Sequence, residues 1–367
     1  MKISMNVEPT FLRPKENNPR NSEGSFLNLP DGRIAFAYSR YTGTSAEDDA
    51  ACDVVCIYSY DGGDSFDTDN VTVLVSGTEY GQKNVMSVTL RYMDNGDIGL
   101  FYVVKYEEGG QHTQYKLRRY KKDFSEHYTE ILVAPDKTTG NFVINNDRVI
   151  RLTSGRWIVL GSLHPTSQQP NEADTSWFDH YGIAYCFVSD DDGFTWRSTP
   201  MRLALNNCYS TSGLQEPGCV ELPGGAVYGY FRTDLKCQYE SVSLDGGEHW
   251  FAPQATRFYS PCSPMLIKRN PYNNRYYAIW NPTPSFFGRI MYDGVWGRTP
   301  FVIASSADGI NYSEPEIIED DPKRGFCYPA MHFIDEKTAL LSYCSGGSED
   351  GDRCLNRTTI RKITIED

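Results

Sequence analysis

Side chains that could bind an anion or transfer a proton recur at the ends of short apolar segments along this chain. They comprise arginines, acids and one tyrosine: Arg20, Arg40, Arg148, Arg232, Arg298, Asp48, Asp49, Asp147, Glu216 and Tyr328. A guanidinium offers a planar fork of N–H donors to a carboxylate, so several arginines together form a strong anion site. Whether these side chains meet depends on the elements that carry them.

A hairpin-like segment recurs six times, at intervals of about 61 residues. Each copy has an apolar stretch, a turn that contains Gly, Asn or Asp, and a second apolar or aromatic stretch, which is typical of a β-hairpin. The turns are expected near Gly32, Gly96, Gly155, Gly225, Asn274 and Lys337. A repeat of this kind predicts one supersecondary unit used many times.

A second element lies between the hairpins and follows the pattern S-x-D-x-G-x-x-[W/F]. It occurs at residues 59–66, 189–196 and 243–250, with a version one residue shorter at 306–312. Ser and Asp side chains can bond backbone groups within a tight turn, the Gly adopts a conformation closed to other residues, and the aromatic ring folds back as a plug. The pattern resembles the Asp-box, or BNR repeat, of sialidases and several unrelated propellers.

Helical periodicity is nearly absent, and short β-branched and aromatic runs bounded by turns dominate. Six repeats of about four strands each predict an all-β fold, a six-bladed β-propeller of four-stranded antiparallel blades. The repeat runs without a break, so residues 1–367 are expected to form a single domain. The C-terminal residues 356–365 and the N-terminal residues 2–7 are expected to pair and close the ring.

Strand direction in such a fold predicts which residues share a face. The start of the first strand in each repeat and the end of the second strand lie on the same face of the ring. The charged residues named above fall at these places, together with Glu23, Ser87 and His164. For any one of them a solvated rim or a structural ion pair is the alternative, but their convergence predicts a ligand site on this face.

The order Arg20, Asp48 or Asp49, Glu216, Arg232, Arg298 and Tyr328 resembles the catalytic series of exo-sialidases of the glycoside hydrolase family 33 type, over essentially the full chain. The resemblance implies a single catalytic domain that releases terminal α-linked sialic acid, or a related acidic nonulosonic sugar, with retention of configuration. It implies that the three arginines bind the sugar carboxylate, that Tyr328 is the nucleophile with Glu216 as its partner, and that Asp48 or Asp49 is the acid/base. Arg40 and Arg148 are the replacement arginines, and Asp147 is a reserve acid.

Each implied role has a physical reason. A carboxylate on the anomeric carbon would repel an Asp or Glu nucleophile, whereas the phenol of Tyr328 is neutral until Glu216 takes its proton. The acid/base must be protonated to assist the leaving oxygen. Crowding of like charges in the segment of residues 42–53 is expected to raise the pKa of Asp48 or Asp49.

The chain also departs from the sialidase pattern. Sialidases usually place the first arginine in an Arg-Ile-Pro motif, whereas Arg20 is followed by Asn-Ser-Glu-Gly. The acid that steadies this arginine is Glu349 or, locally, Glu23. Two alternatives therefore stay open: a hydrolase of another anionic sugar on the same scaffold, and a non-catalytic glycan-binding propeller. Trp177 and Phe178 either line a pocket for an N-acyl group or cover a blade.

Composition and charge exclude several classes of binding partner. The net charge of −13 argues against nucleic acid. No apolar run approaches the roughly 20 residues of a membrane-spanning helix, and no signal peptide is recognisable, so no membrane partner and a cytoplasmic location are expected. The 10 cysteines show no zinc-site spacing and are expected to be free, buried thiols. No cofactor or metal is expected, and the implied partner is a sialylated or other acidic glycan.

Overall fold

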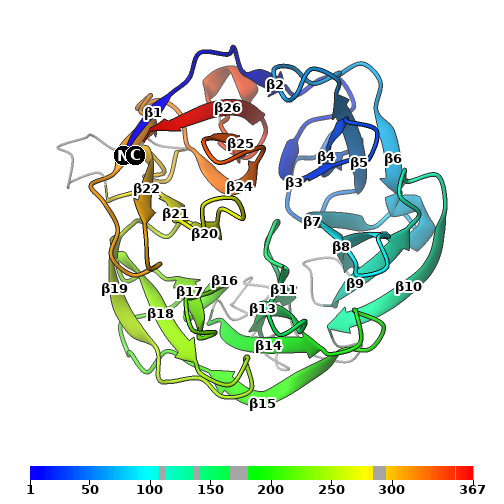
Figure 1. The fold of residues 1–367 in the computed structure, drawn as a ribbon. Helices are drawn as coiled ribbons and strands as arrows, with labels where there is room; N and C mark the ends of the chain where they lie inside the picture. Colours follow the sequence, from blue (N-terminus) through cyan, green and yellow to red (C-terminus); the bar gives the residue numbers. More distant parts are fainter. Residues whose placement is uncertain (107–111, 135–140, 166–180, 284–294, 352, 367) are drawn as a thin grey trace, which may run out of the picture.

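The computed structural model describes residues 1–106, 112–134, 141–165, 181–283, 295–351 and 353–366. Within these residues the regular elements are β-strands and two short 3-10 helices, η1 (Gly77–Tyr80) and η4 (Ser348–Asp350). No helix in the described part of the chain is long and apolar enough to cross a membrane. The strands form five hydrogen-bonded sheets that stand around a common centre (Figure 1).

The first sheet joins the two ends of the chain and contains β1 (Lys2–Ser4), β2 (Thr10–Leu12), β24 (Cys327–Phe333), β25 (Thr338–Cys344) and β26 (Thr358–Glu366). The second sheet has eight strands: β3 (Asn21–Asn28), β4 (Ile34–Tyr41), β5 (Cys52–Ser59), β6 (Thr72–Val75), β7 (Asn84–Tyr92), β8 (Ile98–Lys105), β9 (Thr113–Tyr120) and β10 (His127–Ala134).

The third sheet contains β11 (Asn141–Val143), β12 (Ile150–Arg151), β13 (Trp157–His164), β14 (Ile183–Ser189) and β15 (Arg197–Leu203). The fourth consists of β16 (Gln215–Glu221), β17 (Val227–Arg232), β18 (Cys237–Ser243) and β19 (Gln254–Tyr259). The fifth consists of β20 (Leu266–Arg269), β21 (Tyr276–Trp280), β22 (Phe301–Ser306) and β23 (Glu316–Glu319).

The predicted count of six separate four-stranded blades is wrong. The described strands form sheets of five, eight, five, four and four strands. The eight-stranded sheet is continuous because β5 and β7 are joined by a parallel pair, Cys52 with Asn84, between two antiparallel groups. A hairpin repeat predicts which strands pair within one repeat. It does not predict hydrogen bonds between strands of neighbouring repeats, because these depend on how closely the strands approach in the folded ring.

The hairpins themselves lie where the repeat predicts them. Strands β3–β4, β7–β8, β12–β13, β16–β17, β20–β21 and β24–β25 all pair antiparallel. The predicted closure is also confirmed, since Ile3 on β1 pairs with Ile365 on β26. Phe26 and Phe36 share one apolar cluster with Leu340 and Ile360, so side-chain packing supports the closure between the first and second sheets.

The Asp-box turns have the contacts that the sequence predicts. In the first turn the Ser59 hydroxyl donates to Asp61 at 2.8 Å and accepts from the backbone N–H of Gly63 at 2.8 Å. The same arrangement recurs at Ser189, Ser243 and Ser306. The Trp250 indole folds back to donate to the Gly247 carbonyl at 3.0 Å. These turns stabilise the fold through local hydrogen bonds and contribute no residue to the cavity described below.

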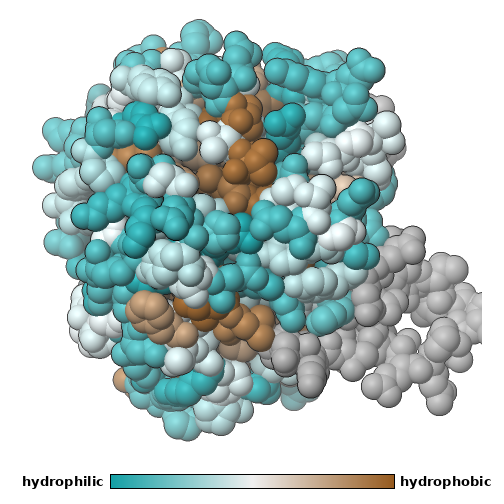
Figure 2. Space-filling model, turned by 90° about the vertical axis from the view of Figure 1, so that its right-hand side faces the viewer, coloured by the Kyte–Doolittle hydropathy of each residue, from teal (hydrophilic) through white to brown (hydrophobic). Residues whose placement is uncertain are grey.

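Burial decreases from the centre of the ring to its rim. Strands β3 and β7 are buried along nearly their whole length, whereas β6 and β10 at the rim are exposed over their first residues and buried at their last two. The face of the molecule in Figure 2 is mostly hydrophilic, with one hydrophobic patch in its upper part and another in its lower part. All ten cysteines are free and eight are buried, which confirms the prediction of free thiols; Cys262 is half-buried and Cys208 is exposed.

Candidate active site

The side chains of the site are aimed by a repeated backbone distortion. Glu23, Ser87, Asp147, Glu216 and Tyr328 all have positive φ, between 42° and 60°. For all of these except Asp147, the register of the inner hairpin shifts at the same place, which marks a β-bulge. A non-glycine residue in this conformation is strained, and such strain concentrates at functional sites. At the bulges on β3, β7, β16 and β24 it turns the side chain into one cavity.

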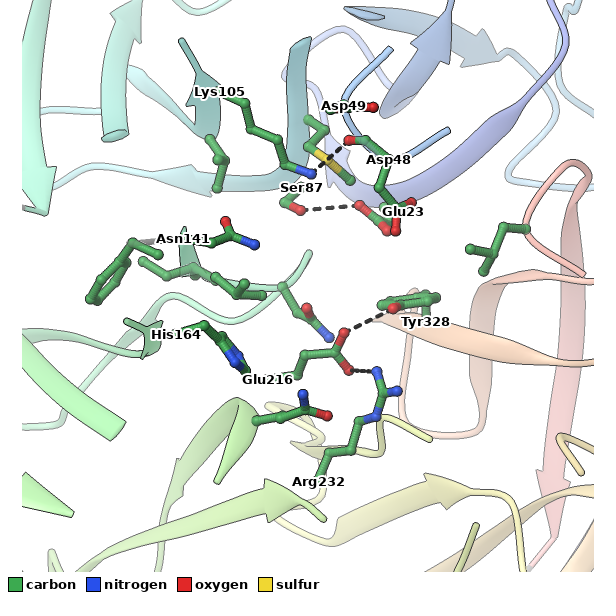
Figure 3. A pocket seen from close by; sticks show the side chains of 18 of the residues that line it. Glu23, Asp48, Asp49, Ser87, Lys105, Asn141, His164, Glu216, Arg232 and Tyr328 are labelled. Atoms are coloured by element: carbon green, nitrogen blue, oxygen red, sulfur yellow. Dashed lines mark hydrogen bonds and ion pairs between the residues drawn. The ribbon is translucent and has the colours of Figure 1, made fainter. Parts of the chain in front are cut away.

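This cavity has a volume of about 600 Å³ and is lined from several strands around the ring (Figure 3). Its polar and charged lining residues are Glu23, Glu47, Asp48, Asp49, Ser87, Lys105, Asn141, Asn145, His164, Gln215, Glu216, Arg232, Arg298 and Tyr328. Met86, Val103, Phe142, Val143, Ile144, Cys262, Trp296 and Leu355 complete it. A volume of this size suits a monosaccharide or a slightly larger ligand.

Tyr328 and Glu216 are hydrogen-bonded to each other in the cavity wall. The Tyr328 hydroxyl donates to Oε1 of Glu216 at 2.8 Å, and Arg232 Nη1 lies 2.7 Å from Oε2 of the same carboxylate (Figure 3). Burial alone would raise the pKa of Glu216, but the charge and hydrogen bond of Arg232, the Tyr328 hydrogen bond and the charge of Arg298 together outweigh burial and lower that pKa. Burial and the Glu216 charge raise the pKa of Tyr328 well above its usual range. The pair therefore holds an ionised carboxylate against a neutral phenol.

Arg298 is a buried cation in the wall of the same cavity. The residue is 4% exposed, and Nη1 lies 3.2 Å from the Cys327 sulfur and 3.7 Å from the Cys354 sulfur. Its Nε is buried without a hydrogen-bond partner, and no carboxylate among the described residues lies in ion-pair distance. Thiols are weak acceptors, so they do not neutralise a guanidinium. An uncompensated buried cation beside a cavity favours an anionic ligand.

Arg20 is a buried cation that contacts residues of the cavity lining but does not itself line the cavity. It is 2% exposed, stacks over the Tyr41 ring with its guanidinium carbon 4.5 Å from the centroid, and forms an ion pair with Asp48. A more distant contact, 3.5 Å from Nη2 to Oε1, joins it to Glu23. Arg232 and Arg298 both line the cavity, whereas Arg20 contacts its lining residues Asp48 and Glu23. The convergence of the three arginines on one carboxylate stays a prediction.

Asp48 and Asp49 both line the cavity, as the sequence predicts, but Asp48 has no raised pKa. Crowding by neighbouring atoms opposes its ionisation, yet the charges of Arg20 and Lys105 outweigh this effect and hold its pKa well below the usual range. The Asp48 side chain is also 70% exposed, so water solvates the carboxylate. The expected effect of like charges fails at Asp48 because the nearest charges are cations.

Besides Arg20, three other predicted site residues lie outside the cavity lining. Arg148 is buried and donates to the Met265 carbonyl at 2.6 Å. Asp147 is buried between Arg91, at 3.0 Å, and Lys268, and so links three sheets near the centre of the ring. Arg40 is half-buried at the end of β4. Asp147 and Arg148 hold the centre of the fold together because buried charges require partners.

Two further predictions concern the acid that steadies Arg20 and the placement of Trp177 and Phe178. Glu349 forms ion pairs with Arg324 and Arg357, so it does not steady Arg20. Asp48 is the closer acid to Arg20, and Glu23 is a more distant one at 3.5 Å. Trp177 and Phe178 lie outside the described residues.

Lys105 is a cavity residue that the sequence did not single out. It ends β8, and its Nζ donates to the Asp48 carbonyl at 2.6 Å. The signal was present, because the second strand of several repeats ends in a cation or a histidine: Arg40, Lys105, His164 and Arg232. Trp296 and Cys262 carry no comparable signal, since they reach the cavity from irregular segments.

Comparison with known proteins places this chain within a family. Residues 37–339 match the model of the BNR repeat-like domain, and the chain belongs to this family. No curated protein sequence matches the chain significantly. The predicted membership of the sialidase superfamily of Asp-box proteins is confirmed at the level of this family and the shared fold.

Solved structures share the fold at low sequence identity. A protein of unknown function from Dyadobacter fermentans has a TM-score of 0.73 and 15% identity, with 99% of each chain covered. The intramolecular trans-sialidase from Ruminococcus gnavus has a TM-score of 0.69 and 12% identity, with 98% of this chain and 97% of that chain covered. The NanB sialidase from Streptococcus pneumoniae has a TM-score of 0.67 and 12% identity, with 96% and 69% covered.

Proposed function

We propose that this protein is an exo-acting retaining glycoside hydrolase that releases terminal α-linked sialic acid, or a closely related acidic nonulosonic sugar. The observation that carries the proposal is the position of Arg298, a buried cation without a carboxylate partner among the described residues, next to the Tyr328–Glu216 pair. The guanidinium carbon of Arg298 lies 5.7 Å from the centroid of the Tyr328 ring. An anionic group and a reacting carbon can therefore be held side by side.

In the first half of the reaction the sugar carboxylate binds Arg298 and Arg232. The Tyr328 oxygen attacks the anomeric carbon while its proton passes to Glu216, and the bond from that carbon to the leaving oxygen breaks. The leaving oxygen takes a proton from Asp48 or Asp49. The product of this step is a sugar linked covalently to Tyr328.

In the second half the same aspartate, now ionised, takes a proton from water, and the water oxygen attacks the anomeric carbon. The bond to Tyr328 breaks, and the phenol recovers its proton from Glu216. Two displacements leave the configuration unchanged. The ion pair with Arg20 holds the pKa of Asp48 low, so Asp48 takes up the proton that it delivers only when this ion pair opens.

The Tyr328–Glu216 pair favours a hydrolase over a non-catalytic glycan-binding propeller. A binding protein gains nothing from a buried phenol hydrogen-bonded to an ionised carboxylate, whereas a nucleophile needs such a base. The second candidate, a hydrolase of another anionic sugar, is favoured by Ser87, Lys105 and Asn141, which make one side of the cavity rich in hydrogen-bonding groups. The acidic glycan is the proposed partner in both cases.

The test is a panel of aryl α-glycosides of N-acetylneuraminic acid and of other nonulosonic acids, together with aryl uronides. Release of the phenol from the sialoside, with the α-anomer as first product by NMR, is the expected result. Cleavage of a uronide alone would move the assignment to the second candidate. Binding of sialosides without cleavage of any member of the panel would overturn the hydrolase.

A further inference from the structure

Glu23 shares its backbone setting with the residues assigned to the reaction. It lies at a bulge near the start of β3 with φ of 52°, as Glu216 and Tyr328 lie at bulges on β16 and β24 with φ of 42° and 54°. In Figure 3 its carboxyl group is on the side of the cavity that also carries Ser87 and Asp48. Glu23 is only 5% exposed. The same local strain therefore places a third carboxyl or phenol group in the cavity wall.

The contacts of Glu23 do not account for a buried charge. Its Oε2 accepts from the Ser87 hydroxyl at 3.0 Å, and its Oε1 is 3.5 Å from Nη2 of Arg20. Arg20 is engaged more closely by Asp48. A buried carboxylate needs close, charge-assisted partners, and a single hydroxyl with a long ionic contact does not supply them.

Groups from every neighbouring element act on Glu23. Burial is the largest effect and raises the pKa of Glu23, and the negative charge of Asp48 raises it further. The positive charges of Arg20 and of Lys105 on β8, and the hydrogen bond from Ser87 on β7, lower it. The balance raises the pKa of Glu23 from 4.5 to about 7. Tyr41 on β4, Cys52 on β5 and Tyr328 on β24 also lie within its electrostatic reach and are neutral groups with raised pKa values.

We propose that Glu23 contacts the acidic sugar directly, and that its neutral carboxyl group donates a hydrogen bond to a sugar oxygen. On ionisation the same group loses its donor and repels the sugar carboxylate, so the site binds substrate well only while Glu23 holds its proton. This inference rests on the proposed function. It makes Glu23 a specificity-determining residue that the sialidase resemblance does not supply.

The alternative role is a positioning one, in which the ionised carboxylate of Glu23 steadies Arg20. The two roles differ for Glu23→Gln, because glutamine keeps the shape and a hydrogen-bond donor but cannot ionise. A positioning carboxylate predicts that Glu23→Gln is impaired at every pH. A neutral donor predicts that Glu23→Gln matches the unsubstituted protein in acid and exceeds it in base.

The experiment measures kcat/KM for an aryl α-sialoside from about pH 5 to about pH 9 in the unsubstituted protein, Glu23→Gln and Glu23→Ala. We expect the ratio of the unsubstituted protein to Glu23→Gln to be constant in acid and to fall about tenfold per pH unit above about pH 7. Glu23→Ala should lose activity at all pH values. Ser87→Ala should move the decline to higher pH, because the Ser87 hydroxyl lowers the pKa of Glu23.

A binding measurement supplies a readout that does not depend on turnover. Calorimetric titration with N-acetylneuraminic acid near pH 8, in two buffers of different ionisation enthalpy, should show proton uptake by the unsubstituted protein and none by Glu23→Gln. If Glu23→Gln keeps the pH profile of the unsubstituted protein, or loses activity at every pH, the role proposed for Glu23 is overturned and the proposed function still stands. Failure of the unsubstituted protein to cleave or bind any acidic sugar would overturn the proposed function and this inference with it.

Discussion

The hydroxyl of Tyr328 lies 2.8 Å from Oε1 of Glu216, although 112 residues separate the two in the chain. Arg232 holds the other carboxylate oxygen at 2.7 Å, so the carboxylate that faces the phenol is ionised and fixed in position. This contact turns a tyrosine on an inner strand into a candidate nucleophile.

Replacing Tyr328 with phenylalanine should abolish most turnover without unfolding the protein, because only one hydroxyl is removed. We expect kcat to fall by roughly 10²–10⁴-fold, the usual contribution of a positioned proton-transfer group, or more. Thermal unfolding should stay close to that of the unsubstituted protein. Tyr209→Phe is the matched control, since Tyr209 is 86% exposed and outside the cavity lining. Near-normal turnover of Tyr328→Phe on every acidic glycoside would contradict a covalent tyrosine mechanism.

Replacing Arg298 with methionine should weaken the binding of N-acetylneuraminic acid by roughly 10–100-fold, the value of a charged hydrogen bond. The variant should be no less stable to heat, because the lost guanidinium has no carboxylate partner among the described residues. Calorimetry and thermal unfolding check the two halves of this prediction. Arg33→Met is the control, because Arg33 pairs with Asp31 in an outer hairpin turn. Equal affinity of Arg298→Met and Arg33→Met would remove Arg298 from the anion site.

Single substitutions should show whether Asp48 or Asp49 is the acid/base. Asparagine at the acting position should slow the cleavage of alkyl glycosides far more than that of activated aryl glycosides, because only a poor leaving group needs a delivered proton. The two single variants are each other's controls, since both residues line the cavity. If each variant slows both substrate types equally, neither aspartate delivers the proton.

Glu23 should make stability depend on pH. Its pKa is raised from 4.5 to about 7, so the folded state holds a proton that the unfolded state releases. The stability gained from this proton is present below about pH 4.5 and is lost as pH rises through about 7. Relative to Glu23→Gln, the unsubstituted protein should lose about 3 kcal/mol of unfolding free energy across this interval, measured by urea denaturation. A constant difference between the two proteins would mean that Glu23 is ionised throughout.

Asp147 should prove to be structural. Asp147→Asn leaves the half-buried cations Arg91 and Lys268 without their shared buried carboxylate and should lower the unfolding free energy by roughly 3–5 kcal/mol. Adding Lys268→Met should restore part of this loss, because one unpaired charge is then removed. If Asp147→Asn loses activity but keeps its stability, Asp147 has a functional role and the structural assignment is wrong.

The sequence by itself determined the local architecture. The hairpins with turns near Gly32 and Gly96, the Asp-box at Ser59, and the pairing of the N-terminal strand with the C-terminal one all occur where they were predicted. Each of these depends on turn chemistry or on alternation along a few residues, and such signals are written into short stretches of sequence. The order of charged residues also identified Glu216, Arg232, Arg298 and Tyr328 as cavity residues.

The tertiary structure alone decided what depends on distances between repeats. The junction of β5 and β7 merges strands that a repeat count keeps apart, and no local pattern records it. Likewise Asp147 and Arg148 have the residue types of a ligand site, but they lie among buried partners at the centre of the ring. The pKa of Glu23 depends on its burial and on the charges of Arg20, Asp48 and Lys105. Burial and Coulomb interactions act through space, so they are settled only when the ring is closed.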